Sequence, residues 1–225
     1  MNRHLVASLA AAALPLALAG CISFGAKPPP SLLTLVSTAQ PPVGQPQRAA
    51  ISPATTRATL SVGNQTVASV TDQAAVAGSS SITIDTPVVS QEIATARVPV
   101  QATPGTVAYV KDAQWIEPPA QLFARLLGDT MTARTGRVVL STAQSYQAGG
   151  ATLTGELRRF GIDAGTRTAI ITYDAALIRA TGGALEKQRF EASVPVASID
   201  AAGAGAGLNQ AANQIAGQVA DWIGR

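Results

Sequence analysis

The hydrophobic pattern divides the chain into an apolar N-terminal run, a weakly patterned stretch and a densely patterned C-terminal part. Residues 5–19 are almost wholly apolar, and a second short apolar segment, 32–36, predicts a first strand. Between 40 and 80 large apolar side chains are few, and the pattern predicts only a hairpin at 60–70. We therefore expect this low-complexity stretch to be partly disordered.

From residue 81 onward, short apolar segments predict a series of strands. They are expected at 82–84, 93–100, 107–110, 138–140, 153–160, 169–177 and 190–196. The last three are separated by turn sequences at Ala164-Gly165 and Gly182-Gly183. Because short turns join neighbouring antiparallel strands, the pattern predicts an antiparallel meander.

A central helix is predicted over about 118–134. Pro118 and Pro119 suit the first turn, where no amide partner is lost, and Gly136 stands where the helix should end. The apolar positions share one face and are Leu122, Phe123, Leu126, Leu127 and Met131. The opposite face carries polar residues, which are Gln121, Arg125 and Asp129. We expect the apolar face to pack in the core.

A second helix is predicted over about 206–224, preceded by a flexible lead at 203–207 that is made of Gly and Ala. Its apolar stripe contains Leu208, Ala211, Ala212, Ile215, Val219, Trp222 and Ile223, and Asn209, Asn213 and Gln218 lie largely off it. The stripe indicates packing on the sheet, with a partner helix or a lipid as the sharper alternative. Together these elements predict a single α+β domain over 31–225, with a mainly antiparallel sheet packed by both helices.

The first twenty residues indicate a lipoprotein signal peptide. Their apolar core of about fifteen residues suits a signal, whereas a membrane-spanning helix needs roughly 20. Leu18, Ala19 and Gly20 then lead to Cys21 in the order of the bacterial lipobox. In that motif the cysteine thiol takes a diacylglycerol group and a peptidase cuts before it. The alternative is an ordinary cleaved signal with a chance cysteine, and it is disfavoured because Cys21 is the only cysteine in the chain.

Residues 21–30 have the composition of a tether between the lipid and the domain. They are small, polar and rich in proline, which favours extended polyproline conformations. An Asp directly after the cysteine would resemble an inner-membrane retention signal, but Ile22 stands there. The sequence therefore predicts a protein that fatty acids such as palmitate anchor to the outer membrane, facing the periplasm.

The charge of the mature chain is too small and too scattered to indicate a nucleic-acid site. The chain has 16 Lys and Arg, of which Arg3 leaves with the signal, so 15 remain against 13 Asp and Glu and the formal net charge is +2. Arg158-Arg159 is the densest basic pair, and no basic stripe or stacking aromatics accompany it. We interpret this pair as a solvated strand end.

The residue inventory argues against catalysis. His4 is the only histidine and leaves with the signal, and Cys21 carries lipid, so the mature chain has neither an imidazole nor a free thiol. Nucleophile–histidine pairs and the usual zinc ligands are therefore excluded. The run 203–207 lacks the Lys-Ser/Thr of a phosphate-binding loop. We expect a non-enzymatic protein with no metal site and no cofactor beyond the covalent lipid.

Four features follow one another in an order shared with a known family. They are the lipobox followed by the apolar segment 32–36; Tyr109, then Trp115 and Glu117 before a helix with Leu122-Phe123-x-x-Leu126-Leu127; a strand ending at Phe160 with a polar turn to Asp163; and a closing helix with Trp222-Ile223. In these features the chain resembles the ABC-type transport auxiliary lipoproteins. That family includes the outer-membrane lipoprotein partners of MCE-type intermembrane lipid transport systems.

The resemblance implies a single α+β domain beside an ABC permease, its ATPase and an MCE-domain protein, and it is compatible with a homo-oligomer. The alternative is a structural or adaptor lipoprotein of the envelope without a transport role, which neighbouring genes would distinguish. Trp115 and Glu117 are the candidate partner-binding or structural motif. We interpret Trp115 first as a core residue that covers the sheet and second as a contact.

Replacing the predicted lipid-bearing residue tests the anchor. In a Cys21→Ser protein we expect no lipid labelling, and either loss of processing or a shift to the soluble periplasmic fraction. The reason is that burial of acyl chains contributes about 0.8 kcal/mol per CH₂, and two or more chains together give stable anchoring. Fatty-acid labelling and membrane fractionation measure both effects. A variant that still pellets with membranes after a high-salt wash would show that lipid does not hold the protein there.

Overall fold

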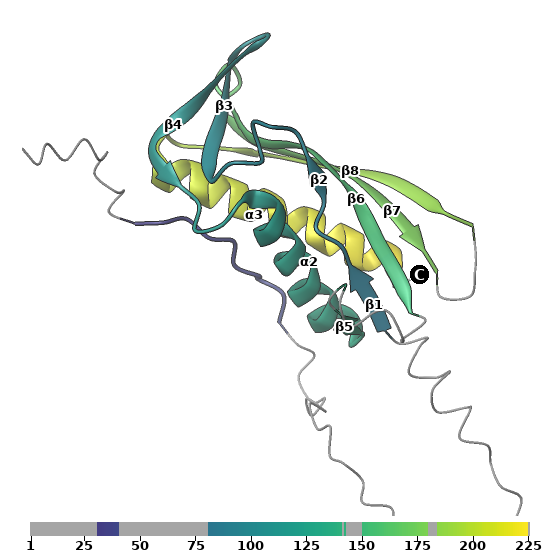
Figure 1. The fold of residues 1–225 in the computed structure, drawn as a ribbon. Coiled ribbons are helices and arrows are strands. Elements are labelled where there is room, and N and C mark those ends of the chain that lie inside the picture. Colours follow the sequence, from purple (N-terminus) through teal and green to yellow (C-terminus); the bar gives the residue numbers. More distant parts are fainter. Residues whose placement is uncertain (1–30, 41–80, 141, 143–149, 180–183, 225) are drawn as a thin grey trace, which may run out of the picture.

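The computed structural model describes residues 31–40, 81–140, 142, 150–179 and 184–224. Within them, eight strands form one sheet and two helices cover one of its faces (Figure 1). The strands are β1 (Ser81–Ile84), β2 (Val88–Val89), β3 (Arg97–Thr103), β4 (Thr106–Gln114), β5 (Val138–Leu140), β6 (Ala151–Asp163), β7 (Thr168–Ile178) and β8 (Glu186–Pro195). The helices are α2 (Pro119–Thr135) and α3 (Ala201–Ile223). The predicted signal peptide, tether, hairpin at 60–70 and turn at 182–183 lie outside these residues.

The sheet is organised around β6, its longest strand. On one edge β6 pairs antiparallel with β7, which pairs antiparallel with β8. On the other edge three short strands follow one another in parallel: β1 at the start of β6, β2 in the middle and β3 at the end. β5 extends the sheet beside β1, and β4 extends it beside β3. The α+β fold and the meander of β6 to β8 are thus confirmed, and the parallel pairings come from segments that precede the meander.

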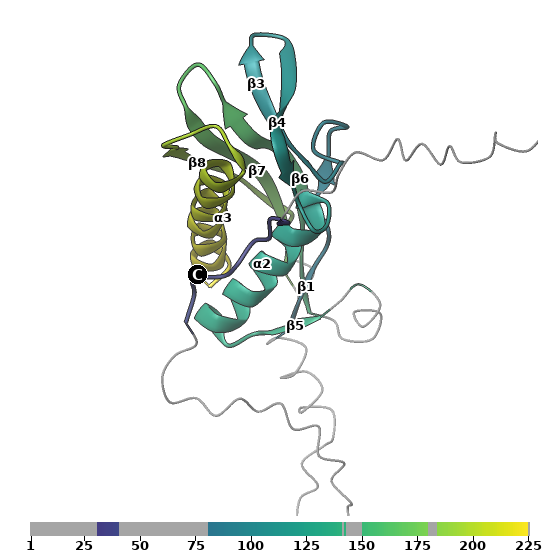
Figure 2. The ribbon, with the colours of Figure 1, turned by 90° about the vertical axis from the view of Figure 1, so that its left-hand side faces the viewer.

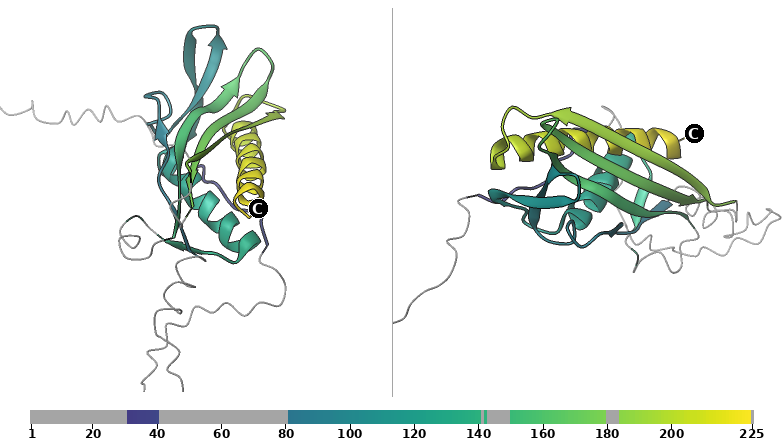
Figure 3. Two further views of the ribbon diagram at one scale, coloured as in Figure 1. Left: turned by 90° about the vertical axis from the view of Figure 1, so that its right-hand side faces the viewer. Right: turned by 90° about the horizontal axis from the view of Figure 1, so that it is seen from above.

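Both helices lie on the same face of the sheet and against each other (Figure 2). α3 runs along β7 and β8, and α2 lies toward β1 and β5 (Figure 3). The five apolar residues of the predicted α2 face are all buried, and its three polar residues are exposed. Gly136 ends α2 in the left-handed conformation, with φ at 67°. The central helix and its faces are therefore confirmed.

Aromatic pairs join the helix layer to the sheet. The ring centroids of Phe123 on α2 and Tyr173 on β7 are 5.2 Å apart, with the ring planes inclined by 72°. Phe190 on β8 and Trp222 on α3 are 5.7 Å apart. Such inclined rings attract each other beyond the gain from buried area alone. The predicted stripe of α3 therefore packs on the sheet, which confirms the first interpretation of that stripe.

The Gly- and Ala-rich run 203–207 is helical, so its prediction as a flexible lead is wrong. α3 begins at Ala201, and Asp200 caps it by accepting a hydrogen bond from the Gly203 amide at 2.8 Å. At Gly207 an added methyl group would lie 2.5 Å from Val196 Cγ1 and 3.0 Å from Ala169 Cβ. The small residues let the helix approach the sheet closely, and this packing outweighs the low helix propensity of glycine.

Several strand boundaries differ from the prediction. The segment 32–36 forms only an isolated bridge at Leu33 and no strand, and helix side chains bind the backbone of Val36, as described below. β3 begins only at Arg97, since Ile93 lies in a turn where its amide donates to the Ser90 carbonyl at 3.1 Å. β8 begins earlier than predicted, at Glu186, because its charged first half also pairs with β7.

Two glycines of α3 should respond oppositely to replacement by alanine. At Gly217 only the far end of the Arg134 side chain lies within 3.0 Å of an added methyl group, and that end can move. Gly217→Ala should therefore raise the free energy of unfolding by about 1 kcal/mol through helix propensity. Gly207→Ala should lower it, because overpacking against the sheet costs about 1–3 kcal/mol. Chemical denaturation measures both, and stabilisation of equal size in the two variants would contradict the close approach at Gly207.

Candidate functional site

The first described segment, residues 31–40, crosses the helix layer, and we call it the strap (Figures 1 and 2). Leu33 forms a parallel bridge with Trp115. The Leu33 amide donates to the Gln114 carbonyl at 2.8 Å, and the Leu33 carbonyl accepts from the Ile116 amide at 2.9 Å. Leu33 and Leu35 also pack against the core. The strap therefore joins the predicted tether to a definite place on the domain.

Two asparagines of α3 hold the rest of the strap. The Val36 amide donates to Asn209 Oδ1 at 2.8 Å, and the Thr38 amide donates to Asn213 Oδ1 at 2.8 Å. Asn213 Nδ2 donates back to the Val36 carbonyl at 2.9 Å. A side-chain amide offers both a donor and acceptors, so it can replace the partner strand that an extended backbone otherwise needs.

This role of the asparagines was not predicted from the sequence, although their spacing carries a signal. Asn209 and Asn213 stand four residues apart, which places them on one face of α3. They also border the apolar stripe of that helix. Amides at i and i+4 along the edge of a buried stripe can bind an extended segment that lies beside the helix.

The two residues of the predicted Trp115–Glu117 motif have different surroundings in the structure. Trp115 is buried, with its ring centroid 5.6 Å from that of Phe160 on β6, and its Nε1 has no hydrogen-bond partner among the described residues. Glu117 lies at the surface, where Arg125 Nη2 donates to its carboxylate at 2.6 Å. Trp115 therefore has a packing role in the structure, and Glu117 forms an ion pair that links the segment before α2 to the helix.

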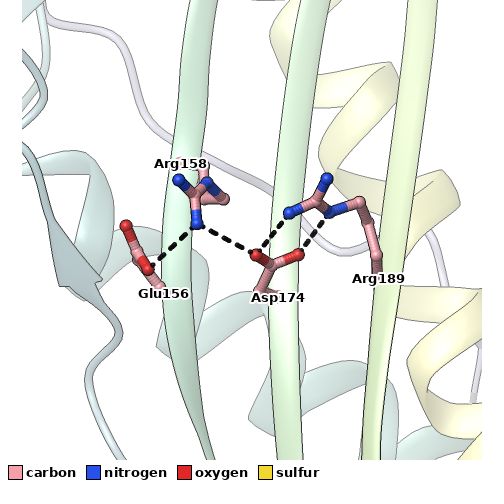
Figure 4. A network of polar contacts seen from close by, with 4 residues as sticks. All are labelled: Glu156, Arg158, Asp174 and Arg189. Atoms are coloured by element: carbon pink, nitrogen blue, oxygen red, sulfur yellow. Dashed lines mark hydrogen bonds and ion pairs between the residues drawn. The ribbon is translucent and has the colours of Figure 1, made fainter.

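The face of the sheet away from the helices carries a row of ion pairs across β6, β7 and β8 (Figure 4). Asp174 is central, since its neighbours on β7 are buried toward the helices and it points the other way. Arg189 donates to both of its carboxylate oxygens, at 2.6 and 2.7 Å. Arg158 Nη1 lies 3.4 Å from Asp174 Oδ2 and 3.5 Å from Glu156 Oε2. We call these four residues the outer-face network.

The electrostatics of the network keep its central carboxylate charged. The hydrogen bond from Arg189 is the main cause that lowers the pKa of Asp174, and Arg158 adds to it. Because the folded-state pKa of Asp174 is lowered, its ion pairs persist at neutral pH and are lost only as the pH falls through that pKa. The same pairing raises the pKa of Arg189. The group therefore presents fixed, balanced charges.

A local irregularity of β6 places two arginines side by side on this outer face. The register of β6 against β7 shifts between Leu157 and Arg159, which makes Arg158 the extra residue of a bulge. Arg158 and Arg159 are therefore both exposed and do not alternate between faces. With Arg189 they border a shallow hollow of about 520 Å³. The prediction of a strand end at this pair is wrong, because the pair lies inside the strand.

The role of Asp174 was likewise not predicted from the sequence, although one signal is present. It is the only charged residue between 168 and 178, in a segment otherwise rich in apolar residues. A single carboxylate at an outward position of such a strand favours a partner on the neighbouring strand. That partner could not be identified without the register that sets Asp174 opposite Arg189.

The described residues also bear on two further functions, metal binding and membrane crossing. In those parts of the chain, no three His, Cys, Asp or Glu side chains come together as a metal site would need. Of the helices described, none combines the length and the apolar character needed to cross a bilayer. Cys21 and the lipobox residues Leu18, Ala19 and Gly20 lie outside the described ranges, so lipidation stays a prediction.

Comparison with known proteins identifies the family. The family model for the ABC-type transport auxiliary lipoprotein component matches residues 59–220. The chain therefore belongs to this family. No protein with a curated description matches it.

Solved structures show that the fold is shared. The crystal structure of a Xanthomonas campestris protein of the DUF330 family is similar with a TM-score of 0.56 at 22% identity, covering 64% of this chain and 83% of that one. A crystal structure of an uncharacterised protein also has a TM-score of 0.56, at 16% identity, covering 64% of this chain and 91% of the other. The PelC dodecamer from Paraburkholderia phytofirmans is less similar, with a TM-score of 0.40 at 13% identity, and the match covers 63% of this chain and 85% of that one.

Removing one asparagine amide should loosen the strap. Asn213→Ala deletes the bonds to the Val36 carbonyl and the Thr38 amide, so we expect a loss of about 1 kcal/mol in the free energy of unfolding. Hydrogen exchange at the Thr38 amide should become faster. Gln210→Ala, at an exposed position of the same helix, is the control and should change neither quantity. Unchanged exchange at Thr38 in the Asn213 variant would show that Asn213 does not hold the strap.

Proposed function

We propose that this member of the ABC-type transport auxiliary lipoproteins is anchored in the outer membrane by lipid on Cys21 and acts without catalytic turnover. Its role is that of an accessory in moving lipids between the inner and outer membranes. The observation that carries the proposal is the family match over residues 59–220. The proposed partners are an ABC permease, its ATPase and an MCE-domain protein, which supply the nucleotide chemistry and the path for the lipid.

The reach of the tether supports a role near one membrane. Residues 21–30 span about 30 Å if they extend in polyproline form at about 3.1 Å per residue. The strap then fixes the domain directly to the end of that tether. A domain held in this way stays close to the membrane that carries its lipid. A partner must therefore bridge the periplasm, and a long MCE-domain assembly is the candidate that the family offers.

The outer-face network is the docking surface that we propose for the MCE-domain protein. It lies on the sheet face away from the helices, so binding there leaves the strap and the anchor undisturbed (Figure 4). Its arginines are exposed and already held in place by carboxylates. Arginine is enriched among residues that contribute most to binding, and complementary charges favour specific association.

Affinity capture through the folded domain tests this function and its surface. Arg189→Glu should weaken capture of the MCE-domain protein at least about tenfold, which corresponds to about 1.4 kcal/mol. Arg125→Glu is a matched control, because Arg125 on α2 has a side-chain exposure of 58% against 55% for Arg189, and each ion pair measures 2.6 Å. The control should capture as well as the native protein. Equal loss in the two variants would exclude the outer face as the specific surface.

Gene deletions distinguish the transport role from the alternative, a structural or adaptor lipoprotein of the envelope. Loss of this gene should make the outer membrane more sensitive to detergents. Combined loss of this gene and the MCE gene should be no worse than either loss alone, because both act in one pathway. Additive defects, together with no MCE-domain protein in the capture, would contradict the transport role and favour the adaptor.

A further inference from the structure

We infer that the end of the domain where the tether leaves makes a direct, non-covalent contact with the bilayer surface. The contact is an apolar patch of Leu32, Ile116 and Ile199, which we call the anchor-end patch. This inference rests on the lipid anchor of the proposed function. It adds which side of the domain faces the membrane.

The strap determines where the tether leaves the domain. It follows α3 in the direction of the helix, with Val36 bound to Asn209 and Thr38 bound to Asn213. Leu33 lies nearer the start of the helix, because its Cδ2 is 2.8 Å from the place of an added methyl group at Gly205. The strap therefore begins at the N-terminal end of α3 (Figure 1).

Two residues of the patch point outward together at this end. Leu33 and Trp115 are bridge partners, and both turn toward the core. Side chains in extended backbone alternate between sides, so Leu32 and Ile116, which precede and follow these partners, both turn outward. Their exposed fractions are 49% and 57%. Two large aliphatic side chains are thus presented to solvent beside the tether.

Ile199 adds a third apolar side chain at the same end. It directly precedes Asp200, the cap of α3, and has an exposed fraction of 37%. The contact of Leu33 with Gly205 lies about one helical turn from that cap. The strap, the segment before α2 and the segment before α3 therefore all bring an apolar side chain to the place where the chain leaves the domain.

The length of the tether identifies the occupant as lipid. Residues 22–30 separate Cys21 from the strap, and nine residues reach at most about 32 Å when fully extended. An anchor on so short a link holds the patch near the bilayer at an effective concentration in about the mM range. Aliphatic side chains bind the membrane–water interface weakly on their own, but as a second contact beside a lipid chain they strengthen attachment to the membrane. The patch can therefore insert at the boundary between headgroups and acyl chains of the membrane that holds the anchor.

The test uses the full lipidated protein in vesicles of phosphatidylethanolamine and phosphatidylglycerol. Ile116→Cys places an environment-sensitive fluorophore at the patch. Val138→Cys is the matched control, because Val138 has the same 57% exposure but follows the C-terminal end of α2, which the ion pair of Arg134 with Asp221 joins to the C-terminal end of α3. Since Cys21 carries lipid, the new cysteine is the only free thiol in each protein.

We expect blue-shifted emission from position 116 that brominated lipids quench, and water-like emission from position 138. Vesicle flotation is measured on the same samples. Proteins that float with water-like emission at both positions would overturn the patch and leave the anchor intact, whereas proteins that do not float would overturn both. A shift at position 116 that needs an added MCE-domain protein and no lipid would assign the patch to a protein partner and overturn the inference.

Discussion

The hydrogen-bonding requirement of β6 is the constraint on which the arrangement of the domain depends. This strand of 13 residues lies inside the sheet, so the backbone groups on both of its edges need partners. β7 supplies the hydrogen-bond partners along one edge of β6. Among the earlier strands that the structure describes, none is long enough for the other edge, and β1, β2 and β3 share it in sequence. The position of β3 then determines where β4 lies, and β4 leads directly to Trp115 and to its bridge with the strap.

The surfaces proposed for attachment and for recognition lie on opposite sides of the domain. The helix layer closes the apolar face of the sheet, and the strap crosses that layer before it reaches the predicted tether. The other face keeps charged side chains paired across three strands. Force on the tether therefore reaches α3 and the segment before α2, whereas a partner on the outer face meets rigid strands. This separation suits a domain that must stay anchored while it engages a partner.

The strap shows how a small set of side chains replaces a strand pairing. Two asparagines on α3 bind its amides and a carbonyl, and only Leu33 makes a backbone bridge. Small residues in the first turns of the same helix let it lie close to the sheet and to Leu33. The two faces of α3 therefore have different roles, since its apolar stripe fills the core and its asparagine amides hold the segment that leads to the predicted anchor.

The sequence by itself determined the helices and strands in which buried side chains recur at one regular spacing along the chain. The faces of α2 and the strands of the meander could be predicted because one side of each element is buried, and that leaves a regular apolar spacing. The lipobox stays a prediction from the sequence, which rests on the fixed order of small residues that its chemistry needs before a cysteine.

Only the tertiary structure decided the features that depend on residues far apart in the chain. Asn213 and Thr38 are 175 positions apart, and neither residue shows its partner in its local pattern. The helical state of 203–207 depends on space beside Val196, and the pairing of Asp174 with Arg189 depends on strand register. Local spacing records which side of an element is buried, but it carries no information on which distant backbone or side chain covers it.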